Sequence, residues 1–186
     1  METNGIVFLD IDGVVNTVMA YPNQVDGLNL KEKEGYYFDL CWPGDKRVSN
    51  KQAMTLVSKL CTDYKLDIVI TSTWSIGHSL DEIRESLYSS GLKREVNIIG
   101  TTCTNMFKSR GFQIEAWLTN NKLDYRTFPV IILDDDSDML GFKTDFTKYL
   151  LQTNTYIGFS FADYIKAQEI IDKQLEVLGW KEEIKN

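Results

Sequence analysis

The stretch Ile6-Val-Phe-Leu-Asp10-Ile-Asp12-Gly13 decides how the rest of the chain can be interpreted. Its apolar residues run without alternation into two carboxylates, which is typical of a strand covered on both faces of a parallel sheet. Asp10 and Asp12 are two positions apart, so on an extended chain both side chains point the same way. Parallel sheets bind ligands beyond the carboxyl ends of their strands, so this pair marks a candidate site. Taken alone, the stretch is equally compatible with a solvated Asp-Gly turn.

Further along the chain, apolar runs alternate with segments of helical periodicity. Ser49 with Gln52 predicts a capping box for the first helix, and the last helix is expected to begin at Ser160. The residues of the last helix expected to face the sheet are Phe161, Tyr164, Ile165, Ile171, Leu175 and Leu178. Alternating strands and helices imply right-handed crossovers and helices on both faces. We therefore predict a Rossmann-like α/β fold, a three-layer α/β/α sandwich with a mainly parallel five-stranded sheet. The expected strands are 6–9, 67–70, 96–99, 130–133 and 149–151, and the expected helices are 50–64, 79–90, one from about 111 and one over 160–178.

The chain is expected to form a single domain over residues 1–186 with one insertion. Residues 17–47 hold turn formers and aromatic residues without a clear period, which predicts a small flap or cap after the first strand. No apolar run approaches the length of a membrane span, and the first five residues lack the features of a signal peptide. We therefore expect a cytoplasmic protein without a membrane partner.

Composition narrows the kinds of site that the chain can hold. The net charge of −7 argues at first against a nucleic-acid partner. Much of that charge comes from Asp10, Asp12 and the acids of 134–138, so with a metal ion among them the remaining surface would be near neutral. The three cysteines are too scattered for a disulfide framework or a thiolate zinc site, and are expected to be buried as small apolar residues. A single histidine, His78, excludes metal sites that need several imidazoles.

Polar groups stand at the ends of several expected elements. Thr71-Ser72 follows the second strand, Asp134-Asp-Asp136 follows the fourth, and Lys108 and Arg110 precede a helix. Since the carboxyl ends of parallel strands share one edge, these groups can converge with the first carboxylate pair. Each signal alone is typical of a loop, a cap or a surface residue. Their joint occurrence in this order favours a metal-dependent phosphoryl site, because several carboxylates on one edge suit magnesium.

This order of motifs resembles the four-motif pattern of the haloacid dehalogenase (HAD) superfamily of phosphotransferases. More narrowly, it resembles the branch found in nucleic-acid repair proteins, to which the phosphatase part of polynucleotide kinase-phosphatase is related. The resemblance extends from Gly5 to Leu178 and departs mainly at 17–47, and Thr71-Ser72 also resembles a motif of 5′-deoxyribonucleotidases. A bacterial receiver domain is disfavoured because the Asp-x-Asp doublet comes first. The matching segments are Phe8–Asn16, Ile70–Trp74, Ser109–Ile114 with Trp117–Leu118, and Ile132–Asp136.

The resemblance implies a role for each matching residue. Asp10 would be the nucleophile that forms an aspartyl-phosphate, and Asp12 would act as general acid and then as general base. A hydroxyl of the Thr71-Ser72 pair would hold the phosphoryl oxygens, and Arg110, or Lys108 in its place, would counter their charge. The expected metal ligands are Asp10, Asp12, Asp134 and Asp135, and the expected substrate-binding residues are Gly13, Asn16, Thr73, Trp74 and Lys108.

We therefore predict a Mg²⁺-dependent phosphomonoester hydrolase, with a nucleic-acid terminal 3′-phosphate as the expected substrate. The alternatives are a 5′-nucleotidase or another small-molecule phosphatase and, from a different class, a non-catalytic module that binds metal or phosphate. The presence of both Asp10 and Asp12 argues against the last of these. Asp136 and Asp138 are expected to cap the loop that contains them. The expected partner is a phosphorylated nucleic-acid end or nucleotide, and the sequence does not indicate the oligomeric state.

Overall fold

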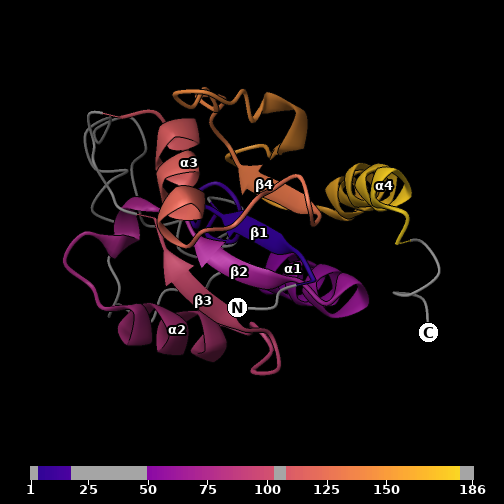
Figure 1. Ribbon diagram of the computed structural model, residues 1–186. Helices are drawn as coiled ribbons and strands as arrows, with labels where there is room; N and C mark the ends of the chain where they lie inside the picture. The colour runs from indigo at the N-terminus through magenta and orange to yellow at the C-terminus, as the bar shows by residue number, and fades with distance from the viewer. Residues whose placement is uncertain (1–3, 18–49, 103–107, 181–186) are drawn as a thin grey trace.

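The computed structural model describes residues 4–17, 50–102 and 108–180. Within them, five parallel strands form one sheet in the order β3-β2-β1-β4-β5 (Figure 1). The predicted α/β fold is therefore confirmed. The strands are β1 (Ile6–Leu9), β2 (Asp67–Ile70), β3 (Ile98–Thr101), β4 (Val130–Asp134) and β5 (Leu150–Gln152), the α-helices are α1 (Lys51–Tyr64), α2 (Leu80–Ser89), α3 (Arg110–Asn120) and α4 (Phe161–Leu178), and the short 3₁₀ helices are η4 (Thr73–Ser75) and η5 (Thr147–Tyr149).

Helices cover both faces of the sheet, and the central strand β1 shows how. Val7 and Leu9 pack into the core cluster on the side of α1, α2 and α4, while Ile6 and Phe8 pack into the cluster on the side of α3. The Phe8 ring meets the Trp117 ring of α3 edge to face, with the ring centroids 5.7 Å apart. Burying each such side chain contributes about 1.5–3 kcal/mol. The unbroken apolar run of β1 thus reflects a strand with a core on both faces.

Several element boundaries differ from the prediction by one or two residues, and two of them concern residues to which the sequence assigned a role. The N-cap of α1 is Asn50, whose side chain accepts from the backbone N–H groups of Gln52 and Ala53. The helix therefore does not use the capping box predicted from Ser49. Strand β3 begins at Ile98, later than expected, and includes Gly100. A Cβ at position 100 would lie 3.1 Å from Nε1 of Trp117. The glycine makes room for this indole and does not end the strand.

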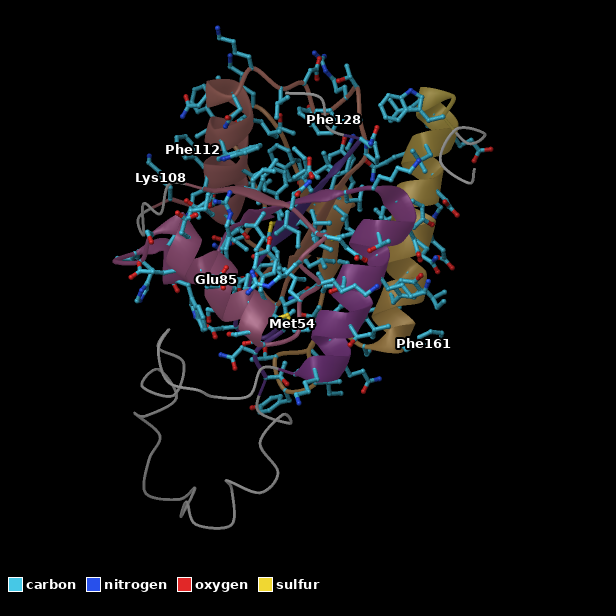
Figure 2. All side chains as sticks on the ribbon, turned by 90° about the horizontal axis from the view of Figure 1, so that it is seen from below. Met54, Glu85, Lys108, Phe112, Phe128 and Phe161 are labelled. Atoms are coloured by element: carbon cyan, nitrogen blue, oxygen red, sulfur yellow. The ribbon has the colours of Figure 1, made fainter. Side chains whose placement is uncertain are left out.

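Helix α4 has the predicted bounds, and its predicted buried face is confirmed in part. Ser160 caps it with a capping box, and Gly179 ends it in the left-handed conformation. Phe161 and Ile165, expected to face the sheet, are 60% and 42% exposed, and Phe161 points away from the neighbouring helix in Figure 2. The expectation was wrong for these two residues, but it is confirmed for Tyr164, Ile171 and Leu175. The buried residues of α4 are Tyr164, Ala167, Ile171 and Leu175.

Several predictions fall wholly or partly on residues that the structure does not describe. The flap predicted at 17–47 lies outside the described residues apart from Thr17, so the organisation as one domain with an insertion stays a prediction. Cys61 is buried, as expected of a small apolar residue, and the other two cysteines lie outside the described ranges. Among the helices of the described part, none combines the length and the apolar character needed to cross a bilayer.

Candidate active site

Three carboxylates converge at the carboxyl end of the central strands. Strands β1 and β4 pair in register with Leu9 opposite Leu133, and the N–H of Asp10 donates to the Leu133 carbonyl at 2.9 Å. Asp10 and Asp134 therefore sit side by side, and Asp135 follows in the chain. One carboxylate oxygen from each of the three acids lies within 4.8 Å of the other two. The structure thus brings together three of the four acids expected to bind metal.

The chain after β1 lies directly against Asp135. Gly13 has φ +75°, and a Cβ at this position would lie 2.3 Å from Oδ2 of Asp135, so a side chain here would be both strained and obstructed. Asp135 is fixed from its other side by β5 and the loop after it. The Thr155 hydroxyl donates to Oδ2 of Asp135 at 2.7 Å, and the Gln152 amide donates to its carbonyl at 3.0 Å. Gly13 therefore leaves free the space that the Asp135 carboxylate occupies.

Arg110, the first residue of α3, contacts two of the three acids. Its Nε lies 2.9 Å from Oδ2 of Asp134, and its Nη2 lies 3.5 Å from Oδ1 of Asp10. The Arg110 side chain is only 15% exposed. A single guanidinium thus bridges carboxylates from two neighbouring strands.

The start of α3 is held against the loop that follows β4, which fixes Arg110. Ser109 is the N-cap, and the carboxylate of Asp138 accepts from the N–H of Arg110 at 3.1 Å. The N–H of Gly111 donates to the Asp138 carbonyl at 3.2 Å. A Cβ on Gly111 would lie 2.1 Å from the Met139 carbonyl oxygen, so only glycine permits this approach. The Asp138 carboxylate therefore caps the first turn of α3, whereas the sequence predicted that it caps its own loop.

Lys108, the other candidate for the basic residue, lies elsewhere. It is exposed, and its ammonium nitrogen sits 5.0 Å from the centroid of the Phe112 ring. Figure 2 shows both residues on the outer side of α3. Arg110 is therefore the basic residue that the structure brings to the acids, whereas Lys108 is engaged with an aromatic ring.

Burial disfavours the ionised forms of Asp10 and Asp134. Burial raises the pKa of Asp10 well above its ordinary value of 3.8, the charge of Asp134 raises it further, and Arg110 opposes both. Burial likewise raises the pKa of Asp134 to about 6, against the lowering effect of Arg110. Although Nε of Arg110 is near Oδ2 of Asp134, its N–H is not aligned on that oxygen, which accepts no hydrogen bond from the described residues. Hard carboxylate oxygens without donors suit a divalent cation such as magnesium.

Two hydroxyls lie at the end of β2, next to the acids. The N–H of Thr71 donates to the Leu9 carbonyl at 2.8 Å, which places the end of β2 beside the end of β1. A hydrogen bond from the Ser72 side chain lowers the pKa of Asp10. The Thr71 hydroxyl is fully buried and has no hydrogen-bond partner in the described parts of the chain. Thr73, the third residue of the run, is exposed.

Asp12 lies near the cluster, but its carboxylate is held by other residues. Oδ1 accepts from the Asn16 amide at 2.6 Å, and Oδ2 accepts from the Trp74 indole N–H at 3.0 Å. The chain leaves the extended conformation after β1, because the N–H groups of Val15 and Asn16 turn back to the Ile11 carbonyl. Since the metal cluster contains no oxygen of Asp12, its role as a metal ligand stays a prediction.

Some contacts of the site carry no evident signal in the sequence. The pairing of Asp12 with Trp74 joins positions 62 residues apart, and the support of Asp135 by Thr155 joins positions 20 apart. Asn16 and Trp74 were singled out as substrate-binding residues, and in the structure both contact Asp12. The only sequence signal for these two contacts is that Asn16 and Trp74 each lie close to a motif residue.

Comparison with known proteins agrees with this geometry. The family model described as the HAD domain in Swiss Army Knife RNA repair proteins matches residues 6–164, which is most of the chain. The match runs from β1 into α4 and so includes every acid of the cluster, both hydroxyls and Arg110. Neither the search of curated proteins nor the search of solved structures found a match.

Proposed function

Because the chain belongs to the family of HAD domains found in Swiss Army Knife RNA repair proteins, we propose that it is a magnesium-dependent phosphomonoester hydrolase acting on a nucleic-acid terminal 3′-phosphate. The observation that carries this proposal is the meeting of Asp10, Asp134 and Asp135 at one edge of the sheet, with Arg110 across them. Four charged groups in a mostly buried site at the ends of parallel strands are the arrangement that phosphoryl transfer needs.

The proposed reaction has two displacements at phosphorus. In the first, a carboxylate oxygen of Asp10 bonds to phosphorus while the bond to the ester oxygen breaks, and Asp12 gives its proton to the departing alkoxide. In the second, water attacks the aspartyl-phosphate and gives a proton to Asp12, the Asp10–phosphorus bond breaks, and inorganic phosphate leaves. The atoms and protons balance over the cycle, and both acids return to their starting states.

The remaining residues have supporting roles in this proposal. Asp10, Asp134 and Asp135 would hold the magnesium ion, which when bound offsets the negative charge of the phosphoryl group and of the acids. Arg110 would stabilise charge on the equatorial phosphoryl oxygens. The hydroxyls of Thr71 and Ser72 are placed to donate hydrogen bonds to the same oxygens.

The first experiment tests the chemistry and not the substrate. Asp10→Asn removes the nucleophile with little change in shape and is expected to abolish phosphate release while the circular dichroism spectrum stays unchanged. The matched control is Asp136→Asn, because Asp136 is an exposed acid in the loop that follows β4, lies outside the cluster and is not expected to be needed for activity. Chelation should remove activity reversibly, and added Mg²⁺ should restore it. Full activity in Asp10→Asn would remove this residue from the mechanism.

The second experiment tests the substrate. Oligoribonucleotides with a 3′-phosphate, oligonucleotides with a 5′-phosphate, free mononucleotides and sugar phosphates are compared by phosphate release, with Asp10→Asn protein as the blank. The proposal expects the 3′-phosphorylated oligonucleotide to be hydrolysed fastest. Faster hydrolysis of free mononucleotides would instead support a nucleotidase. Magnesium binding without hydrolysis of any substrate would support a non-catalytic module.

A further inference from the structure

Trp74 belongs to the short 3₁₀ helix that follows β2, and its indole reaches across to the chain after β1. Its Nε1 donates to Oδ2 of Asp12 at 3.0 Å. The ring is half-buried and packs against the core cluster on the side of α1, which anchors the indole where it is. Trp74 therefore contacts the acid–base candidate itself, through a group held by the core.

The two donors to Asp12 hold both oxygens of its carboxylate. An indole N–H can only donate, so it holds Oδ2 of Asp12 as an acceptor, while the side-chain N–H of Asn16 donates to Oδ1. Trp74 is anchored by the core and thus fixes the direction of the carboxylate, and Asn16 supports the other oxygen. The two contacts together hold the carboxylate in one orientation.

Without these contacts, the Asp12 carboxylate could turn toward the divalent ion. Asp12 follows Asp10 by only two residues, yet its carboxylate contributes no oxygen to the cluster of Asp10, Asp134 and Asp135. A carboxylate that turned onto the divalent ion would become a ligand and would no longer carry a proton to the leaving group. Holding Asp12 away from the ion therefore preserves its use as a general acid.

We propose that Trp74 is a positioning residue for Asp12: its indole N–H keeps the carboxylate off the metal and directed at the leaving oxygen. This inference rests on the proposed function, because it assumes that Asp12 is the general acid. Trp74 then acts through Asp12 and not by stacking on the substrate. The sequence alone had favoured the substrate-binding role.

The test distinguishes a loss of proton donation from a loss of substrate binding and from a loss of structure. Trp74→Phe keeps an aromatic ring and removes the N–H. Two substrates of similar size are compared by kcat/KM, which reports on events up to departure of the leaving group. Benzyl phosphate releases an alkoxide that needs a proton, whereas p-nitrophenyl phosphate releases a stable anion that does not.

The proposal expects Trp74→Phe to lower kcat/KM for benzyl phosphate about tenfold, a fraction of what general acid catalysis supplies, and to leave p-nitrophenyl phosphate within about twofold. Asp12→Asn should show the same pattern with a larger loss, and adding Trp74→Phe to it should cost nothing more. Equal losses on both substrates would indicate a structural or stacking role and would overturn the proposal, as would the absence of any loss.

A measurement without turnover tests the contact itself. Hydrogen exchange of the Trp74 indole N–H, followed by NMR, should accelerate in Asp12→Ala relative to the unaltered protein, since the acceptor is gone. Unchanged exchange would show that Asp12 does not hold the indole, and the proposal would fail. A protein that releases no phosphate from any substrate would contradict the proposed function instead, and the exchange measurement distinguishes the two outcomes.

Discussion

Nε of Arg110 lies 2.9 Å from Oδ2 of Asp134, which joins the first turn of α3 to the end of β4. Ion pairs taken out of water add little net stability, because the loss of hydration offsets most of the attraction. The charges around this pair are also unequal in number, since three carboxylates, those of Asp10, Asp134 and Asp135, meet one guanidinium. The arrangement is therefore better explained by the binding of a cation and a phosphoryl group than by stability.

The first prediction concerns Arg110 and its neighbour Lys108. Arg110→Gln should lower kcat about 10²–10³-fold, the range found when one preorganised donor to a developing charge is lost. Lys108→Ala, the matched control, should leave kcat within about threefold, because an exposed cation away from the acids contributes little. Phosphate release and circular dichroism measure both variants. A larger effect from Lys108→Ala would reverse the assignment of the basic residue.

The second prediction concerns pH. The pKa of Asp134 is raised to about 6 in the fold, above its ordinary value of 3.8, so the folded protein binds this proton more tightly than the unfolded chain does. The stabilisation this gives is fully present below the unfolded pKa and is lost as pH rises through the folded value. Metal-free protein should therefore lose part of its thermal stability between about pH 4 and pH 7 through this group.

Bound magnesium should oppose this loss of thermal stability with rising pH. The ion binds the ionised carboxylates and competes with their protons, so its stabilising effect grows as the acids ionise. The rise in melting temperature on adding Mg²⁺ should be larger at pH 7.5 than at pH 5. In Asp134→Asn the effect should be small at both values. An equal rise at both pH values in the unaltered protein would mean that the ion binds elsewhere.

Much of the site followed from the sequence because its geometry is a property of parallel sheets. Once β1 and β4 were recognised as buried strands, Asp10 and Asp134 had to end at the same edge, and the register of Leu9 with Leu133 places them side by side. The choice between Lys108 and Arg110 did not follow. It depends on Ser109 being the N-cap, which makes Arg110 the first helical residue.

The contact that holds the Asp12 carboxylate could not be predicted, for a different reason. It is a hydrogen bond from the indole of Trp74, in the short 3₁₀ helix after β2, and such a tertiary contact has no local pattern in the sequence. The inclusion of Gly100 in β3 was missed on similar grounds, because the ring that lies over this glycine, Trp117, comes from α3.

The third prediction uses two glycines with similar backbone angles. Gly13 and Gly77 have φ of +75° and +83°, but a Cβ on Gly13 would collide with Asp135, whereas a Cβ on Gly77 would meet no atom within 4 Å among the described residues. Both alanine variants should pay the backbone strain of about 1–3 kcal/mol, seen as a lower melting temperature. Only Gly13→Ala should also weaken Mg²⁺ binding, measured by titration calorimetry. Equal metal affinity in the two variants would show that Gly13 does not position Asp135.

The fourth prediction concerns the Thr71 hydroxyl, which is buried at the end of β2 without a hydrogen-bond partner in the described residues. A buried hydroxyl left unsatisfied costs about 1–3 kcal/mol, so Thr71→Val, which keeps the shape, should leave the substrate-free protein as stable or make it more stable. If the hydroxyl serves the phosphoryl group, the same variant should lower kcat/KM by about tenfold, since a charge-assisted hydrogen bond is lost.

Ser72→Ala provides the contrast to Thr71→Val. The Ser72 side chain already has a partner, because its hydrogen bond lowers the pKa of Asp10. Its removal should therefore raise that pKa further and lower the stability of the metal-free protein at pH values where Asp10 is ionised, because the carboxylate loses a donor. Thermal melts with and without Mg²⁺, combined with phosphate release, separate the two hydroxyls. A loss of stability in Thr71→Val with full activity would mean that Thr71 has a structural partner and that Ser72 alone faces the phosphoryl group.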